Sequence, residues 1–229
     1  SVYETDMSLR MQLVANNESV IFITSDSFDN DNANTLINQS QSVIDNTIGF
    51  TNYDVGHTVS TGGGGLAARG SVCTTSKARG ITGSPAPVGD PFDIDYVAHE
   101  VGHQFGSNHT FNNSCGNNRA GGQAVEPGSG STIMAYAGIC PTDVQSNSDF
   151  YFHAVSIAEM TSHITGPTGN CVAGVANGNN APVIQNIANY TIPKGTPFVL
   201  TGVATDDSSS SMTYCWEQTN PGASTALPS

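Results

Sequence analysis

Basic residues are scarce in this chain. Its 229 residues include only 6 lysines and arginines against 19 aspartates and glutamates, so the net charge at pH 7 is −13. Nucleic acids and anionic membrane surfaces both require a basic patch on the protein that binds them. We therefore expect no nucleic-acid partner and no membrane partner, whereas this negative charge would tolerate bound Ca²⁺.

The chain also lacks a long hydrophobic run and a targeting segment. The apolar run at 20–23 is far shorter than the roughly 20 residues that span a membrane. Ser1 opens a polar stretch unlike a signal peptide, so we expect a processed or truncated chain. Hydrophobic residues nevertheless make up 37% of the sequence, which is enough for a folded core.

No two cysteines lie close together. The sequence contains Cys73, Cys115, Cys140, Cys171 and Cys215. Structural zinc sites use close thiol pairs such as CxxC, so we interpret these cysteines as disulfides of a protein in an oxidising compartment. The odd number leaves one thiol without a partner inside this chain.

Hydrophobic periodicity predicts strands and helices along the first 172 residues. Strands are expected at 8–14, 20–23, 53–60, 66–72 and 77–82, and helices over 32–48, 96–105 and 153–164. Asp29 or Asp31 would cap the first helix, and Asp93 or Asp95 the second. The Asn/Gly-rich stretch at 111–131 predicts an irregular loop.

The sequence changes character after residue 172. A Gly/Asn-rich linker at 173–180 precedes short apolar runs separated by turns, as in a β-sandwich. These runs lie at 183–184, 190–192, 198–200 and 213–216. A sandwich needs about 100 residues, and 181–229 supplies roughly half of them, so we expect an incomplete module there.

The strongest signal is the stretch 99–109, His-Glu-Val-Gly-His-Gln-Phe-Gly-Ser-Asn-His. His99 and His103 are four residues apart on a predicted helix, so both imidazoles can reach one metal ion. Glu100 lies beside them, placed to hold a metal-bound water. Gly106 can adopt a positive φ, end the helix and bring His109 round as a third ligand. Three nitrogens leave a fourth position open, as in a catalytic zinc site.

This pattern resembles the long zinc-binding signature of the metzincin clan of metalloendopeptidases. The stretch 131–138, Ser-Thr-Ile-Met-Ala-Tyr-Ala-Gly, resembles the clan's Met-turn, in which Met134 would lie beneath the zinc. Cysteines flank the motif as they do in the bacterial reprolysin-like (adamalysin-like) proteases, to which residues 8–171 are most similar. Tyr136 departs from the adamalysins and is typical of other metzincin branches.

The resemblance implies an α+β fold. We expect a metzincin-type catalytic domain over 1–172, with a twisted mixed sheet, a zinc helix and an irregular lower subdomain. After the linker, 181–229 resembles the Ig-like or PKD-like modules of secreted bacterial proteases. Metzincins have a further strand and helix before the strand expected at 8–14. Either an upstream segment has been removed, which we favour, or the sheet is built differently.

The resemblance also implies roles for individual residues. It supports the disulfides Cys73–Cys171 and Cys115–Cys140, which leave Cys215 free. In metzincins an edge strand binds extended substrate above the zinc, and the order of the chain assigns that strand to 66–72, with the substrate-binding residues Leu66, Ala67, Ala68, Arg69 and Gly70. The phenol of Tyr136 would ligate the resting metal or donate to the tetrahedral intermediate.

We therefore expect a secreted, monomeric zinc endopeptidase that cleaves protein or peptide substrates. Glu100 would take the proton of the zinc-bound water and pass it to the departing amine. Two other functions compete with this one: an adhesion or binding module with a structural zinc, and a hydrolase of non-peptide amides. An intact Glu100 argues against a purely structural zinc.

Other chemistry-bearing residues have simpler interpretations. His57, His153 and His163 are expected to be structural. Five aspartates could either bind Ca²⁺ or form turns and helix caps, and we favour turns and caps. They are Asp29, Asp31, Asp90, Asp93 and Asp95. The glycine run at 62–65 lacks the Lys-Ser/Thr of a phosphate-binding loop and suggests a flexible entry to the substrate strand.

Overall fold

The chain divides into two compact units in a computed structural model that describes residues 1–140, 143–207 and 212–224. The first unit comprises Ser1–Cys171 and Gln218–Ser229, and the second is Val172–Glu217. In the described ranges, no helix has both the length and the hydrophobicity to cross a bilayer. The first unit is a mixture of helices and a small mixed sheet, which is the α+β class that the sequence predicts.

A three-stranded sheet organises the first unit. Its strands are β1 (Thr58–Ser60), β2 (Gly64–Ala67) and β3 (Gly80–Gly83). Their order is β1-β3-β2, with β1 parallel and β2 antiparallel to β3. The central strand β3 is buried along its whole length. The strand β2 pairs on one side only within this described sheet and is an edge strand.

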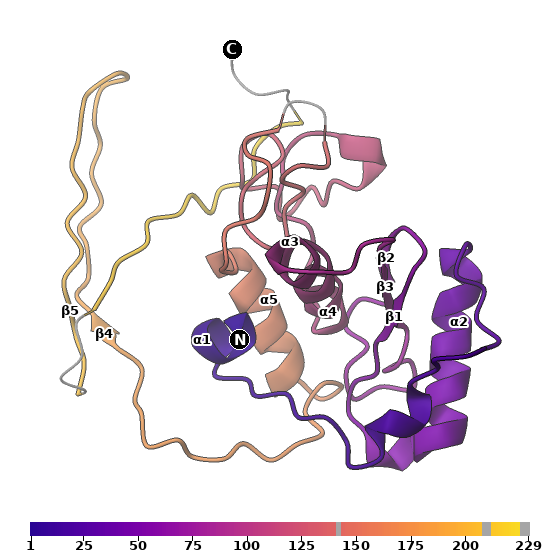
Figure 1. Cartoon of the computed structure of the whole chain (residues 1–229). Helices are drawn as coiled ribbons and strands as arrows, with labels where there is room; N and C mark the ends of the chain where they lie inside the picture. Colours follow the sequence, from indigo (N-terminus) through magenta and orange to yellow (C-terminus); the bar gives the residue numbers. More distant parts are fainter. Residues whose placement is uncertain (141–142, 208–211, 225–229) are drawn as a thin grey trace. The chain divides into compact units, whose positions relative to one another are not determined.

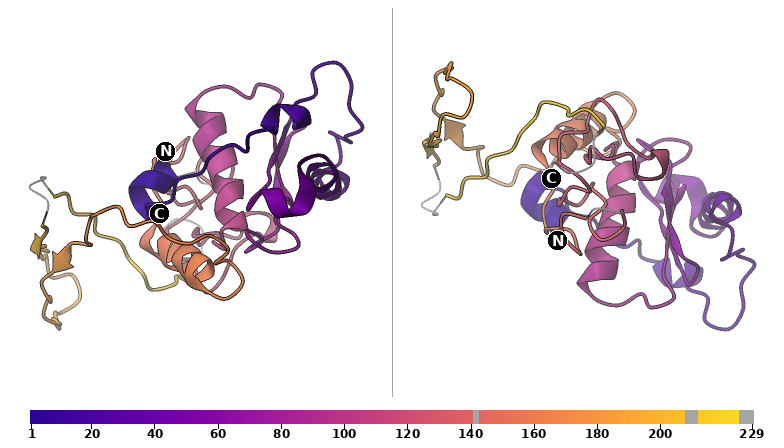
Figure 2. Two further views of the ribbon diagram at one scale, coloured as in Figure 1. Left: turned by 90° about the horizontal axis from the view of Figure 1, so that it is seen from below. Right: turned by 90° about the horizontal axis from the view of Figure 1, so that it is seen from above.

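Helix α2 (Ala33–Ile44) and helix α4 (His99–Gln104) lie on opposite faces of the sheet (Figures 1 and 2). Leu36 and Ile37 of α2 pack against Ile81 of β3, as the predicted amphipathic helix requires. A π-helical turn η2 (Asp45–Gly49) and a 3₁₀ turn η3 (Phe50–Asn52) follow α2.

The start of α2 corrects the expected cap. Asn32, rather than Asp29 or Asp31, caps the helix, because its side chain accepts from the N–H groups of Asn34 and Thr35.

The helix that carries the metal-binding motif begins earlier than the sequence predicts. Its consecutive segments are α3 (Asp90–Phe92), η4 (Asp93–Ala98) and α4. We call this run, Asp90–Gln104, the central helix. It follows Gly89 and has proline in its first turn, where the missing N–H costs nothing. Neither Asp93 nor Asp95 is therefore the cap, and the Asp95 carboxylate accepts from the Ser148 N–H at 2.8 Å.

The strands predicted at 8–14 and 20–23 are absent from the described residues. Helix α1 (Val2–Met7) ends where the Leu9 N–H donates to the Tyr3 carbonyl, and a 3₁₀ turn η1 (Asn17–Val20) lies downstream. The alternating Met11 and Leu13 are 42% and 83% exposed. Alternation alone does not make a strand, because backbone N–H and C=O groups need a neighbouring strand to pair with.

Helix α5 (Ala154–Thr165) lies beside α1, as the views in Figures 1 and 2 agree. The His153 ring caps α5 by accepting from the Val155 N–H. The main hydrophobic core lies between these helices and the central helix, where the Tyr3 ring packs 5.0 Å from that of Phe152 and its hydroxyl donates to the Ala98 carbonyl at 2.6 Å. The predicted helices over 32–48 and 153–164 are therefore confirmed.

Two disulfides close the first unit. They join Cys73 to Cys171 and Cys115 to Cys140, the pairs that the family resemblance implies. Cys215 is free and exposed. The second disulfide lies in the irregular segment after the central helix, where the only helical turn in the described part of 111–140 is η5 (Cys115–Asn117).

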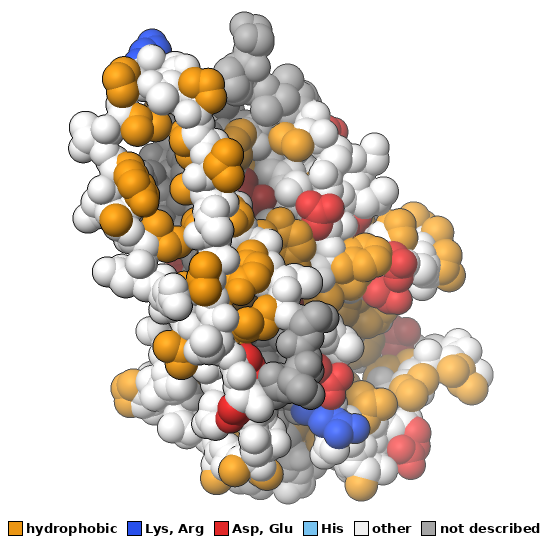
Figure 3. Space-filling view, turned by 90° about the vertical axis from the view of Figure 1, so that its left-hand side faces the viewer, with side chains coloured by type: hydrophobic (Ala, Val, Ile, Leu, Met, Phe, Trp, Pro, Cys, Tyr) orange, Lys and Arg blue, Asp and Glu red, His pale blue; other side chains and the backbone are white. Residues whose placement is uncertain are grey.

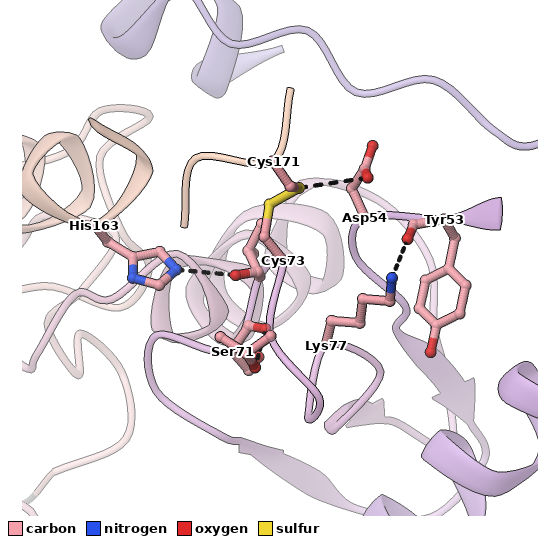
Figure 4. The surroundings of a disulfide bond; sticks show 9 residues. Tyr53, Asp54, Ser71, Cys73, Lys77, His163 and Cys171 are labelled. Atoms are coloured by element: carbon pink, nitrogen blue, oxygen red, sulfur yellow. Dashed lines mark hydrogen bonds between the residues drawn. A yellow bond between two sulfur atoms is a disulfide. The ribbon is translucent and has the colours of Figure 1, made fainter. Parts of the chain in front are cut away.

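Figure 4 shows what surrounds the bond between Cys73 and Cys171. The His163 ring of α5 is hydrogen-bonded to the Val72 carbonyl at 3.2 Å. On the other side Lys77 is buried, with its ammonium donating to the Tyr53 carbonyl at 2.5 Å and lying over the Tyr53 ring. The disulfide thus joins the segment that follows α5 to the segment that follows β2.

The second unit contains one short antiparallel pair, β4 (Val183–Ile184) and β5 (Ala204–Thr205). Of the predicted runs, 183–184 forms a strand, whereas 190–192, 198–200 and 213–216 do not. Many large hydrophobic side chains of this unit are exposed, among them Tyr190, Phe198 and Trp216. Figure 3 shows hydrophobic side chains scattered over one face of the molecule. The sandwich over 181–229 remains a prediction, and its residues 208–211 and 225–229 lie outside the described ranges.

Candidate metal centre

The three histidines of the motif converge on one point. His99 and His103 project from successive turns of α4, and the chain then turns at Gly106, whose φ is 109°. This backbone conformation favours glycine. The turn brings His109 back, so that the three ligand nitrogens lie within 4.8 Å of one another. They form the only group of three or more potential ligand side chains found in the described part of the chain.

Each imidazole is oriented by a backbone carbonyl at its Nδ1 atom. The His99, His103 and His109 Nδ1 atoms lie 2.7, 2.8 and 2.6 Å from the carbonyl oxygens of Ile133, Ser107 and Asn118, respectively. A carbonyl can only accept, so each neutral ring carries its hydrogen on Nδ1 and presents the lone pair of Nε2 to the centre.

The Nε2 atoms are left for a cation. The buried His99 Nε2 has no hydrogen-bond partner, and the Nε2 atoms of His103 and His109 are only 3.0 Å apart. Three converging lone pairs repel one another unless a positive ion lies between them, so these residues fit a zinc ion. Burial lowers the pKa of all three histidines, that of His103 to about 4, which keeps the rings neutral for binding.

Glu100 lies at the centre's edge, next to strand β2. Its side chain is 9% exposed, and burial raises the pKa of its carboxyl to about 8. A Cβ atom at Gly65 would overlap the Glu100 carboxylate, so the strand can approach this closely only with glycine there. Within the glycine run, Gly65 thus contacts the carboxylate directly.

The Met-turn stretch packs against the central helix. Met134 is fully buried, and a Cβ atom on Gly102 would lie 2.5 Å from its sulfur. The same stretch supplies the Ile133 carbonyl that orients His99, and the Met134 carbonyl accepts from the Thr110 N–H at 3.1 Å. Met134 therefore packs against the helix that carries two of the ligands, and its place beneath a zinc ion remains a prediction of the resemblance.

Tyr136 lies directly against the ligand rings. Its ring centroid is 5.5 Å from that of His99 and 4.6 Å from those of His109 and Phe111. Burial raises the pKa of its phenol to about 12, and the Glu100 charge adds to this rise. A hydrogen bond with the Asn118 side chain opposes it. Tyr136 is thus a protonated hydroxyl donor near neutral pH.

The expected substrate strand at 66–72 is shorter in the structure. Leu66 and Ala67 belong to β2, and the Ala68 N–H donates to Arg79 across the sheet at 2.8 Å. Arg69 and Gly70 lie beyond the strand: the Arg69 guanidinium donates to the Gly106 carbonyl, and the Gly70 N–H to the His103 carbonyl.

The N–H groups of Ser71 and Val72 likewise donate to the Gln104 carbonyl. Residues 70–72 therefore donate to the carbonyls at the C-terminal end of the central helix, a contact that the prediction of an extended strand over 66–72 did not include.

The remaining histidines lie outside the centre. His57 is hydrogen-bonded to Gln104 and Thr82 at 2.8 Å each, and burial lowers its pKa to about 4. His153 caps α5, and His163 contacts the Val72 carbonyl. These contacts suit the structural roles expected of them. Calcium binding by the aspartates remains a prediction.

Sequence reasoning missed the backbone carbonyls of Ser107 and Asn118 that orient two of the ligands. Any residue type can supply a carbonyl, so no residue pattern marks these positions. The Asn/Gly-rich composition of 111–131 predicted the irregular path that brings Asn118 back to His109, but not the contact itself.

Comparison with known proteins agrees with this geometry. Residues 1–110, just under half of the chain and ending one residue after the third histidine, match the family described as Metallo-peptidase family M12B Reprolysin-like. No curated protein matches the sequence. The fold and the three-histidine centre define a zinc metalloprotease and fit the metzincin clan. Within that clan, the matched residues make the chain similar to the reprolysin-like M12B metallopeptidases.

Proposed function

We propose that this chain is a secreted endopeptidase in which Glu100 is the general base. The observation that carries the proposal is the position of Glu100, which adjoins His99 on the central helix and reaches the backbone of β2. A carboxylate held at this position can accept a proton from water and return it to a leaving group. A purely structural zinc would have no use for such a group.

Zinc, when bound by His99, His103 and His109, supplies a Lewis acid that polarises the scissile carbonyl and makes water a better nucleophile at neutral pH. Glu100 accepts the proton of the attacking water and passes it to the departing amine. The Tyr136 hydroxyl donates to the developing negative charge on the carbonyl oxygen. The nearness of its ring to His99 and His109 supports this role.

An extended peptide would bind along the edge strand β2. Neighbouring residues of a strand direct their N–H and C=O groups to opposite sides. The Ala68 N–H points to β3, so those of Ala67 and Gly65 point to the free edge, and Glu100 lies over the face of the strand at Gly65. These groups can form main-chain hydrogen bonds with a substrate by strand addition. Arg69 and Gly70 would then support the strand rather than bind substrate.

Secretion is proposed from the two disulfides, which persist in oxidising compartments. We propose that the protein works as a monomer, as expected from the sequence. Two functions compete with this one: an adhesion module and a hydrolase of non-peptide amides. Neither requires a peptide bound along β2 beside Glu100, and the following test distinguishes both from an endopeptidase.

The test is cleavage of denatured casein by the wild-type chain and by Glu100→Gln. We expect chelator-sensitive fragments from the wild type and a loss of about 100- to 10,000-fold in the variant, with one zinc per chain retained by elemental analysis. Asp45→Asn, a carboxylate far from the centre that accepts from Tyr53, is the matched control. Wild-type cleavage by Glu100→Gln, or no fragments from the wild type, would refute the proposal.

A further inference from the structure

We infer that two carboxylates, Glu126 and Glu159, are positioning residues that hold the third ligand, His109, by binding the residues on both sides of it. The inference deepens the proposed function, since it rests on a zinc ion at the three histidines. Its evidence lies in six hydrogen bonds that these two carboxylates accept.

Glu159 holds the residue that precedes His109. It projects from α5, and its Oε2 accepts from the Asn108 N–H at 2.7 Å while its Oε1 accepts from the Asn108 side-chain amide at 2.6 Å. The two bonds together fix both the backbone and the side chain of Asn108. The Gly106 turn also packs on α5, because a Cβ there would lie 3.1 Å from the His163 Cβ.

Glu126 holds the residue that follows His109. Its side chain is 7% exposed, and one carboxylate oxygen accepts from the hydroxyls of Thr110 and Thr132. The other accepts from the N–H groups of Ser131 and Thr132 at 2.9 and 3.0 Å. Four donors satisfy a buried carboxylate, and such charge-assisted bonds are stronger than neutral ones.

Only His109 needs this support. His99 and His103 are fixed to each other by the hydrogen bonds of α4, whereas His109 lies in a segment without regular structure. Glu126 also links that segment to residues 131–132, directly before the Ile133 carbonyl that orients His99. The two carboxylates therefore keep the third ligand in register with the other two, a preorganisation that a metal site needs to bind tightly.

The experiment measures zinc affinity rather than catalysis. Glu126→Gln and Glu159→Gln, made in the full chain, are stripped of metal and titrated with zinc against a chelating dye at a temperature where each apo-protein is folded by circular dichroism. We expect the dissociation constant for zinc to rise about 10- to 100-fold in each variant. The visible absorption of the Co²⁺-loaded protein should also change, because it reports ligand geometry.

Asp45→Asn is the matched control, since Asp45 also accepts from a hydroxyl, that of Tyr53, but at the far end of α2. It should leave both the zinc affinity and the Co²⁺ spectrum unchanged. If Glu126→Gln does not fold, Thr110→Val takes its place, because it removes a single donor and leaves Glu126 its other three.

A wild-type dissociation constant in the folded variants, even with a lower melting temperature, would show that the carboxylates only stabilise the fold and would overturn the inference. Failure of the proposed function is a separate result. A chain that binds zinc in this way but cleaves no peptide would refute the endopeptidase and leave the positioning role intact.

Discussion

At the scale of single residues, the centre depends on which nitrogen of each histidine is protonated. Carbonyls from three separate segments, those of Ile133, Ser107 and Asn118, accept from the Nδ1 atoms. Each carbonyl orients its ring and makes it a better ligand. The irregular loop and the Met-turn stretch are therefore as necessary to the centre as the helix that carries the motif.

Tyr136 is the residue whose role a single substitution decides. Tyr136→Phe keeps the ring contacts with His99 and His109 but removes the hydroxyl donor. If the hydroxyl stabilises the oxyanion, kcat should fall about 10- to 1,000-fold, with zinc content and melting temperature unchanged. Tyr53→Phe, which removes a hydroxyl bonded to Asp45 away from the centre, should keep full kcat. Wild-type turnover in Tyr136→Phe would leave only a packing role.

The ligand histidines could be predicted from sequence, because the spacing of four on a helix and the glycine that follows can be recognised in the residues themselves. Glu126 and Glu159 could not. They lie 17 and 50 residues beyond His109, and nothing in their local pattern distinguishes them from other acidic side chains. Their partners, Thr110 and Asn108, become evident only when α5 and the loop have folded back onto the motif.

At the scale of elements, the strand β2 connects the sheet to the centre. Its inner side pairs with β3, and its residue Gly65 touches the Glu100 carboxylate. If Glu100 is the general base, as proposed, this single edge strand would align an extended substrate with it.

Proline substitutions on the two sides of β2 test which side binds substrate. Ala67→Pro removes an N–H that faces the free edge, so the KM for peptides should rise about 5- to 10-fold, the equivalent of one hydrogen bond. Ala68→Pro instead removes the bond to the Arg79 carbonyl and should chiefly lower the melting temperature. Steady-state kinetics and thermal unfolding of both variants test this. An unchanged KM in Ala67→Pro would remove β2 as the substrate strand.

The elements predicted best are those whose packing depends on their own periodicity. Helices α2 and α5 bury one face against a neighbour and lie where the spacing indicates. The strand predicted at 8–14 fails for the opposite reason, because a strand depends on a partner elsewhere in the chain. The capping residues were predicted wrongly for a local reason, because several residues that can cap a helix follow one another in the sequence. Asn32 caps α2, and the central helix begins at Gly89-Asp90-Pro91, ahead of Asp93 and Asp95.

At the scale of the whole molecule, the two disulfides constrain very different lengths of chain. Cys73–Cys171 closes a loop of 98 residues that contains the entire metal centre, whereas Cys115–Cys140 closes 25 residues of the irregular segment. Cys73 also directly follows the segment whose N–H groups satisfy the end of the central helix. The Cys73–Cys171 bond thus joins the segment after α5 to residues 70–72, one of which donates to the His103 carbonyl.

Deleting each disulfide should therefore destabilise the protein to a different degree. In the chain-entropy model, removing the bond that closes the longer loop lowers the free energy of unfolding by about 4.7 kcal/mol, and removing the other lowers it by about 3.5 kcal/mol. We expect the pair Cys73→Ala/Cys171→Ala to lower the free energy of unfolding more than Cys115→Ala/Cys140→Ala. Urea unfolding of the zinc-loaded chain, followed by far-UV circular dichroism, measures both. All three proteins should carry Cys215→Ser, since a free thiol can exchange with either bond. If the shorter loop contributed more, the contacts of the irregular segment, rather than chain entropy, would dominate the stability of this fold.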